Sequence, residues 1–269
     1  MPSSFTGQRT LLNFGAVDYE ATVFVNGQNV TYHVGGYFEF TVDITSHLNT
    51  NGTNELLVFV HDPTDLDPYV IPIGKQTLMP SHIFYTPCSG IWQQVWIESA
   101  PANWITQLDV SAGMNGDVNV TAYTYGNATS PLDVSVSMYE RNSTTVCASG
   151  KGQSGASLTF NLNSPKLWSP NSPTLYDLEV KVGSETIRSY TGFRTISRGE
   201  VNGIERPLLN GEFIFQFGTL DQGFWPDGIY VPPNREAMVF DLQTLKNLGF
   251  NMLRKHVSVA AQSTLACSY

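Results

Sequence analysis

The stretch Ala21-Thr-Val-Phe-Val25, Asn26-Gly27, Asn29-Val-Thr-Tyr-His-Val34 decides the fold of the N-terminal part of this chain. Asn-Gly between two β-rich runs is a strong hairpin signal, because the turn that matches strand twist needs positive φ at both central residues. Gly35-Gly36 then forms another turn before Tyr37-Phe-Glu-Phe-Thr-Val42, which is typical of a further strand. The sequence here predicts antiparallel β structure.

Two further segments extend this prediction outward. Glu55 to His61 is predicted to be a buried strand. Ile91 to Glu98 carries large apolar side chains at both alternating sets of positions, so we expect it to lie between two layers. Short strands with regular turns and no helical period favour an antiparallel sandwich.

A second block of short strands follows Pro101. Six segments are rich in β-forming residues: Gln107–Val110, Val118–Tyr125, Leu132–Tyr139, Leu158–Leu162, Leu175–Val182 and Glu185–Tyr190. Six or seven strands in about 95 residues have the rhythm of an immunoglobulin-like sandwich, although the Cys…Trp…Cys pattern of antibody domains is absent. Trp168, in a turn bounded by prolines, is expected to plug this sandwich rather than to bind a ligand.

The last part of the chain has a different pattern. Phe213-Ile-Phe-Gln-Phe217 is predicted to be a strand, and a loop follows it to Tyr230. Asn234 offers a helix N-cap, Gly249 is expected to end that helix at its C′ position, and Phe250 to Val257 is predicted to be a second strand. This order opens an alternating α/β domain.

The composition excludes several classes of function. A chain of 269 residues suggests two or three domains, and 41% apolar against 14% charged residues indicates a folded protein. Lys plus Arg number 14 and Asp plus Glu number 23, so the net charge of −9 argues against nucleic acid as a partner. The longest apolar runs, such as Leu56 to Val60, are far shorter than the ~20 residues of a membrane helix, so no membrane partner is expected.

The cysteines and histidines give no reason to expect a disulfide framework, cysteine catalysis, a metal or a cofactor. Cys88, Cys147 and Cys267 are widely spaced, and the first two are interpreted as small buried apolar residues. The histidines are scattered, without clustered carboxylates: His33, His47, His61, His82 and His256.

Five groups of residues, in order along the chain, carry a family resemblance. They are Ala21–Gly27 with His33–Phe38, Tyr85–Trp92 with Val95–Glu98, Trp168-Ser-Pro with Leu175–Leu178, Leu209-Asn-Gly211 with Leu220–Gly228, and Gly249–Arg254. From about Leu11 to His256 the chain resembles glycoside hydrolase family 2, the group of β-galactosidases, β-glucuronidases and β-mannosidases.

The resemblance implies a mainly β chain of three parts. These are a jelly-roll sugar-binding-type domain (1–100), an immunoglobulin-like β-sandwich (101–196) and the first βα units of a (β/α)₈ barrel (197–269). A complete barrel takes about 250 residues, so we expect the chain to be truncated at both ends, within the jelly roll and within the barrel.

The resemblance also implies the chemistry. Hydrolysis in this family uses two glutamates on later barrel strands, and neither can be located here, so no catalytic residue is assigned and this chain is expected to be inactive. Part of a sugar subsite is expected where the first two barrel strands end: Asp221, Trp225 and Asp227 after the first, and Arg254 and His256 after the second. The alternatives are a packed loop for the first three residues and a structural role, such as a salt bridge in the barrel floor, for the last two.

The predicted function is that of a family 2-like protein concerned with the hydrolysis of O-glycosyl bonds of terminal β-linked sugars, with a carbohydrate as partner. The alternative is a non-catalytic carbohydrate-binding or adhesive β-sandwich protein. The segment from Leu208 to His256 favours the first, because a binding module has no reason to keep a strand–helix–strand segment with an exposed apolar face.

The sugar, the oligomeric state and the localisation stay open. Met1 to Thr10 lacks the basic start and apolar run of a signal peptide, whereas full-length relatives are expected to be secreted. Five Asn-x-Ser/Thr sequons, whose use stays open, are typical of secreted chains: Asn29, Asn51, Asn119, Asn127 and Asn142.

Overall fold

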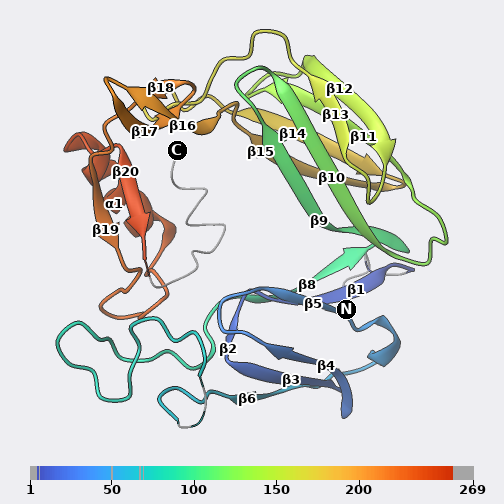
Figure 1. Cartoon of the computed structure of the whole chain (residues 1–269). Coiled ribbons are helices and arrows are strands. Elements are labelled where there is room, and N and C mark those ends of the chain that lie inside the picture. The colour runs from blue at the N-terminus through green and yellow to red at the C-terminus, as the bar shows by residue number, and fades with distance from the viewer. Residues whose placement is uncertain (1–4, 6, 50, 67, 69, 257–269) are drawn as a thin grey trace. The chain divides into compact units, whose positions relative to one another are not determined.

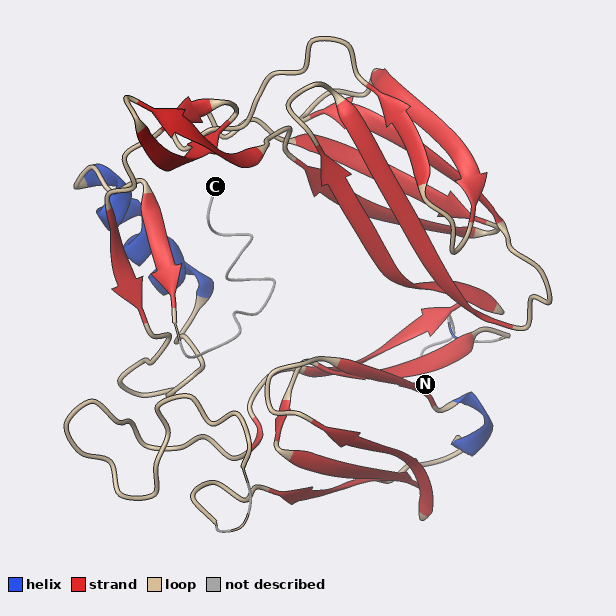
Figure 2. Ribbon diagram, in the orientation of Figure 1, coloured by secondary structure: helices blue, strands red, loops and turns tan. Residues whose placement is uncertain are grey.

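A computed structural model describes residues 5, 7–49, 51–66, 68 and 70–256 (Figure 1). Its regular structure is mainly β, as Figure 2 shows. The chain divides into two compact units, Met1–Ser99 together with Gln216–Tyr269, and Ala100–Phe215. Among the described residues, no helix combines the length and the apolar composition that a membrane crossing needs.

The N-terminal part of the first unit is a β-sandwich. Its strands are β1 (Arg9–Phe14), β2 (Val17–Asp18), β3 (Glu20–Val25), β4 (Gln28–Val34), β5 (Phe40–Asp43), β6 (Leu56–His61), β7 (Gly90–Ile91) and β8 (Val95–Ala100), with a 3₁₀ turn η2 (Thr45–His47). They form sheets in the orders β5-β1-β8 and β4-β3-β6, and β2 pairs with β7. The core between the sheets includes Phe14, Val23 and Val25, and Phe14 stacks on Phe40 with ring centroids 4.7 Å apart.

The hairpin predicted at Asn26-Gly27 is confirmed. The two residues have φ of 49° and 77°, and Val25 pairs with Gln28 across the turn between β3 and β4. Gly36 has a second reason to be glycine beyond turn formation, because a Cβ atom there would overlap the carboxylate of Asp18. This close approach brings the turn after β4 against the end of β2.

The predicted burial of the segment from Glu55 to His61 is wrong. The strand β6 forms, but it lies at the edge of its sheet, and Leu57 and Phe59 are 47% and 59% exposed. A run of apolar residues predicts a strand, but it does not say whether another layer covers that strand.

The single buried strand predicted from Ile91 to Glu98 is also wrong. β7 ends at Ile91, β8 begins at Val95, and Trp96 remains 39% exposed. At the interruption the backbone N–H groups of Trp92 and Gln93 both donate to the carbonyl of Ala16 at 3.4 Å, which breaks the regular pairing. The indole N–H of Trp92 donates to the carbonyl of Gly36 at 2.7 Å.

The second unit is the immunoglobulin-like sandwich. Its strands are β9 (Asn103–Ala112), β10 (Asp117–Gly126), β11 (Asp133–Glu140), β12 (Val146–Gln153), β13 (Leu158–Asn161), β14 (Tyr176–Val182) and β15 (Glu185–Thr191). One sheet has the order β13-β10-β9 and the other has the order β12-β11-β14-β15. The core includes Val118, Val136, Met138 and Val180, each at most 1% exposed. A small sheet follows, of β16 (Ile196–Val201), β17 (Ile204–Leu209) and β18 (Glu212–Phe213).

The strand–loop–helix–strand order predicted for the last part is confirmed, with changed bounds. β19 (Gly218–Asp221) and β20 (Met252–Lys255) pair in parallel, and α1 (Arg235–Asn247) lies between them in the chain. Asn234 caps α1 by accepting a bond from the Ala237 N–H at 2.8 Å, and Gly249 follows the helix with φ of 88°. The helix has no buried residue.

The strand predicted at Phe213 to Phe217 is wrong, because β18 ends at Phe213 and β19 begins only at Gly218. The Phe217 N–H instead donates to the side chain of Asn251 at 2.9 Å, and the Phe217 ring stacks on Phe250. The strand predicted from Phe250 to Val257 is shorter, and Val257 lies outside the described residues.

Candidate functional site

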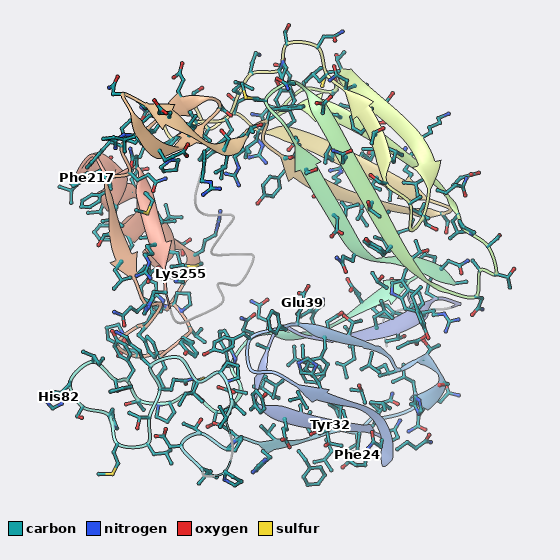
Figure 3. The ribbon with its side chains drawn as sticks, in the orientation of Figure 1. Phe24, Tyr32, Glu39, His82, Phe217 and Lys255 are labelled. Carbon is teal, nitrogen blue, oxygen red and sulfur yellow. The ribbon has the colours of Figure 1, made fainter. Side chains whose placement is uncertain are left out.

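The carboxyl ends of β19 and β20 bring together two oppositely charged side chains. Lys255 Nζ donates to Asp221 Oδ2 at 2.8 Å, and the second carboxylate oxygen accepts from the Gly223 N–H at 2.7 Å. The His256 N–H donates to the Asp221 carbonyl at 2.9 Å. Lys255 is labelled on β20 in Figure 3. Ends of parallel strands are the usual place for a ligand in α/β folds, so this edge is a candidate site.

Arg254 does not join this cluster on its own face of the sheet. In the parallel register Asp221 lies beside Lys255, and Leu220 lies beside Arg254. Because side chains alternate along a strand, Arg254 projects to the face opposite Asp221 and Lys255, where it is exposed. The residues predicted from the sequence to form one site are therefore separated. Asp221 lies on one face of the two-stranded sheet and Arg254 on the other, while Trp225 and Asp227 lie in the loop after β19.

The loop after β19 carries the other candidates. Trp225 is half-buried, and its backbone N–H closes a turn by donating to the Ile229 carbonyl at 2.7 Å. Asp227 is exposed. Two polar atoms at this edge are buried without a hydrogen-bond partner in the structure, Gln222 Oε1 and His256 Nδ1. Buried polar atoms normally find partners, so Gln222 Oε1 and His256 Nδ1 are candidates for contact with a ligand.

An aromatic cluster, formed by Tyr37, Tyr85, Trp92, Phe224 and Tyr230, fixes this loop against the N-terminal sandwich. Phe224 stacks on Tyr85 with centroids 3.8 Å apart, and Tyr230 lies 5.2 Å from Trp92. The hydroxyls of Tyr37 and Tyr230 are 3.1 Å apart. Tyr230 is only 7% exposed, and this burial raises the pKa of its hydroxyl. The loop is therefore held in place by rings from both ends of the first unit.

A polar network lies beside the aromatic cluster. Gln76, which is 1% exposed, donates through Nε2 to the Ile73 carbonyl and accepts at Oε1 from the Cys88 N–H at 2.6 Å. Its side chain also hydrogen-bonds Asp18, which is 5% exposed. Burial, with the Asp62 carboxylate as a second cause, raises the pKa of Asp18 to about 6.

Two cysteines lie among the described residues, and neither is ionised at neutral pH by its surroundings, because burial raises the pKa of both thiols. Cys88 and Cys147 are free and half-buried. Burial, with Asp18 and Asp62 as further causes, raises the pKa of Cys88 to about 11, so this thiol is protonated at neutral pH. Among the residues that the structure describes, no group of three or more His, Cys, Asp or Glu side chains is arranged to hold a metal ion.

Trp168, predicted to plug the immunoglobulin-like sandwich, is half-buried, and it is the neighbouring Leu167 that packs against the core of that sandwich. A Cβ at Gly192 would be 3.2 Å from Trp168 Cβ, and the Arg194 guanidinium lies 4.8 Å from the Trp168 ring. The backbone N–H of Trp168 donates to the Phe193 carbonyl at 2.9 Å.

Sequence reasoning missed Lys255, Phe224, Tyr230 and Gln76. Lys255 lies between Arg254 and His256 in the sequence, and alternation along a strand shows only that the Lys255 side chain faces away from both. The register between β19 and β20 is needed to place Lys255 beside Asp221. The aromatic contacts join residues as far apart as 37 and 230, which no local pattern reveals.

Two family models match the chain. The model described as glycosyl hydrolase 2 galactose-binding domain-like matches residues 1–68, and the model described as glycosyl hydrolases family 2 matches residues 101–194. They correspond to the two sandwiches, in the order in which these occur.

Several proteins similar to this chain are named β-glucuronidases, and one is named a β-galactosidase large subunit. The enzyme of Paenibacillus borealis is 26% identical over 233 residues, which cover 79% of this chain and 37% of the relative. The Mus musculus enzyme is 24% identical over 282 residues, which cover 93% of this chain and 41% of the relative. The apo structure of a β-glucuronidase from Ruminococcus gnavus matches the whole fold with a TM-score of 0.80 at 18% identity, covering 100% of this chain and 46% of that chain.

A galactose-binding-like sandwich followed by an immunoglobulin-like sandwich defines the N-terminal portion of a glycoside hydrolase. The chain belongs to glycoside hydrolase family 2, which confirms the resemblance seen in the sequence. It spans less than half of the length of each of the three proteins above.

Proposed function

We propose that this chain is the sugar-facing N-terminal portion of a family 2 β-glycoside hydrolase, with terminal β-glucuronides as the substrate class. The observation that carries the proposal is the pair of consecutive family matches, supported by β-glucuronidases that align with most of the chain. The proposed parts are a jelly-roll domain (1–100), an immunoglobulin-like domain (101–196) and the first units of a (β/α)₈ barrel (197–269).

The barrel assignment rests on the parallel pairing of β19 with β20 across α1. In a (β/α)₈ barrel each parallel strand is followed by a helix, and the loops after the strands carry the ligand site. Asp221 and Lys255 end two neighbouring strands here. The alternative of a purely adhesive β-sandwich protein gives no reason for this unit.

The proposed sugar contacts come from the loop side of β19 and β20. Asp221 accepts hydroxyl hydrogen bonds through its carboxylate, and His256 and Gln222 offer the two buried atoms without partners. Trp225 supplies a ring for stacking on a pyranose. Asp227 is exposed and accepts hydroxyl hydrogen bonds at the rim, whereas Arg254, on the opposite face of the sheet, does not share a sugar with Asp221.

The chain by itself is not expected to hydrolyse a glycoside. Hydrolysis needs two carboxyl groups on either side of the bond, one of them a general acid with a raised pKa. Asp18 has a raised pKa and an acidic neighbour, but at 5% exposure no glycosidic oxygen reaches it. Asp221 forms an ion pair with Lys255, with Lys255 Nζ 2.8 Å from Asp221 Oδ2, and no second carboxyl group is placed across from it among the described residues at this edge.

The test measures binding and turnover separately. Amide chemical shifts are followed during titration with methyl β-D-glucuronide, with methyl β-D-galactoside for comparison, and p-nitrophenyl β-D-glucuronide is used to detect hydrolysis. We expect weak binding with shifts at residues 221–227 and 254–256, and no turnover. Asp221→Asn should weaken the binding, whereas Asp241→Asn on the exposed side of α1 should not.

Shifts confined to the immunoglobulin-like strands would contradict the proposed site. Turnover that copurifies with the chain and survives in Asp221→Asn would contradict the assignment of the chain as a non-catalytic portion. Equal weak binding of both glycosides would leave the site in place and remove the preference for glucuronides.

A further inference from the structure

Asp18 is a buried carboxyl group without a counter-charge. Its side chain is 5% exposed and lies against the turn after β4, where a Cβ atom at Gly36 would overlap the carboxylate. Asp18 takes part in none of the ion pairs formed by the described residues. Because a carboxylate loses most of its hydration in such a place, the charged form is costly and the protonated form is favoured.

The groups that face Asp18 add to this cost. Burial and, as a second cause, the Asp62 carboxylate raise the pKa of Asp18 to about 6. Asp62 is fixed in place by the backbone N–H of Thr64 at 3.1 Å, by the Thr64 hydroxyl at 2.7 Å and by the hydroxyl of Ser89. Three more titratable groups interact with Asp18, and none of them can become a cation: Cys88, Tyr37 and Tyr230.

The segment 62–89, between β6 and β7, covers the Asp18 carboxyl. Gln76 in this segment hydrogen-bonds Asp18 and is only 1% exposed. Gln76 is also bound within its own segment, because Nε2 donates to the Ile73 carbonyl at 3.1 Å and Oε1 accepts from the Cys88 N–H at 2.6 Å. Hydration of an ionised Asp18 therefore requires the segment as a whole to move away.

The same segment holds the loop after β19, which carries part of the candidate site. Tyr85 stacks on Phe224 with ring centroids 3.8 Å apart, and the two parts of the chain lie side by side in Figure 1. Tyr37, which also interacts with Asp18, has its hydroxyl 3.1 Å from that of Tyr230. Movement of the segment away from Asp18 therefore loosens this loop.

We propose that Asp18 is an acid switch for the candidate site. With Asp18 protonated, the segment 62–89 and the loop after β19 stay packed on the N-terminal sandwich. Ionisation of Asp18 places a second negative charge beside Asp62, and relief of this repulsion releases both. That the released loop serves a sugar site rests on the proposed function, whereas the contacts between the segment and the loop stand without it.

The direction of the pH dependence follows from the two states. In the packed state Asp18 keeps its proton up to about pH 6, whereas in the released state it is hydrated and ionises near its ordinary pKa of 3.8. Packing is therefore fully favoured below about pH 4 and loses stability as the pH rises through about 6. A difference of about two pKa units changes the opening equilibrium by up to ~100-fold.

Amide hydrogen exchange of the full chain, without a sugar and from pH 4.5 to 8, tests the switch. Each rate is divided by the intrinsic exchange rate at that pH, so that the opening equilibrium remains. In the wild type, protection of peptides covering 73–88 and 222–230 should fall by up to ~100-fold as the pH rises. Protection of β11 in the second unit should not follow this profile. A wild type whose corrected protection of 73–88 and 222–230 is constant with pH overturns the proposal.

Two variants and a matched control identify the group responsible. Asp18→Asn should keep high protection at every pH, because asparagine has no charge and retains an oxygen that accepts from Gln76. Asp62→Asn, which removes the neighbouring charge, should move the midpoint of the profile to lower pH. Glu39→Gln, at an exposed carboxyl two residues after Tyr37, should behave like the wild type. A pH dependence that persists in Asp18→Asn, or a midpoint that Asp62→Asn leaves unchanged, overturns the proposal.

Titration with methyl β-D-glucuronide at pH 5 and pH 7.5 distinguishes the switch from the proposed function. Tighter binding at pH 5, with a smaller pH dependence in Asp18→Asn, supports control of the site by Asp18. Equal binding at both pH values in the wild type overturns that control. No binding at either pH, together with the expected exchange profile, contradicts the proposed function and supports the switch alone.

Discussion

Asp18→Asn should stabilise the first unit at neutral pH and remove much of its pH dependence. Asp18 is 5% exposed, and burial with the nearby Asp62 raises its pKa from 3.8 to about 6. Below about pH 4 this carboxyl is protonated in both the folded and the unfolded chain. Between about pH 4 and 6 the folded chain keeps a proton that the unfolded chain has released, so this group makes stability fall as the pH rises.

The magnitude follows from the size of the shift. Each unit of pKa corresponds to about 1.4 kcal/mol, so a rise of about two units corresponds to about 3 kcal/mol lost between pH 4 and 7. Asparagine carries no charge and keeps an oxygen that accepts from Gln76. The variant should therefore match the wild type near pH 4 and be more stable at pH 7, by up to about 3 kcal/mol.

Urea unfolding followed by tryptophan fluorescence at pH values from 4 to 8 measures this difference. Other titrating groups act on both proteins, so the difference between variant and wild type isolates Asp18. Asp241→Asn, on an exposed helix position, is the control and should show a constant difference. A variant that is less stable than the wild type at pH 7, or a difference that does not change with pH, would refute the reasoning.

Three further predictions concern local contacts. Tyr230→Phe removes the hydroxyl that lies 3.1 Å from Tyr37 and should lower the free energy of unfolding by about 1 kcal/mol, whereas Tyr125→Phe, at an exposed position, should leave it unchanged in urea titrations. Asn234→Ala removes the N-cap of α1 and should lower the stability of this helix by about 1 kcal/mol. Hydrogen exchange should become faster in Arg235–Asn247 but not in β19, and unchanged exchange would contradict a capping role. Leu178→Ala, at 1% exposure in the core of the second unit, should cost about 2–5 kcal/mol in thermal unfolding, and a change below about 1 kcal/mol would contradict the close packing of that core.

Local signals in the sequence predicted local structure well. The Asn26-Gly27 turn, the Asn234 cap and the Gly249 stop each depend on the conformation of one or two residues. Each was therefore visible without knowledge of the remainder of the chain. The strands between Val118 and Thr191 other than β12 followed for the same reason, since alternating apolar residues mark a strand with one buried face.

One strand was missed because its composition hides it. β12 reads Val-Cys-Ala-Ser-Gly-Lys-Gly-Gln, which has low β propensity. Gly150 and Gly152 face the other sheet, and a Cβ at Gly150 would lie 2.6 Å from Leu158 Cδ2. The two glycines make room for side chains from β13, a requirement that comes from tertiary packing and that propensity does not express.

The candidate site was predicted only in part. Asp221 and His256 lie at neighbouring strand ends, as expected from the chain order, and their backbones are hydrogen-bonded. The partner of Asp221 is Lys255, and Arg254 points to the other face, because parallel register decides which side chains share a face. Sequence spacing alone does not give that register, and whether these residues contact a sugar stays a prediction.

The discontinuity of the first unit has a consequence for folding. The contact between Tyr37 and Tyr230 spans 193 positions, and the second unit occupies much of that interval. Closing a longer flexible loop costs more entropy, about 0.6 kcal/mol for each doubling of its length. Folding of the inserted sandwich shortens the flexible loop that the aromatic cluster must close. We therefore expect the two units to be coupled through chain entropy, so that melting of the second unit weakens the contact between Tyr37 and Tyr230.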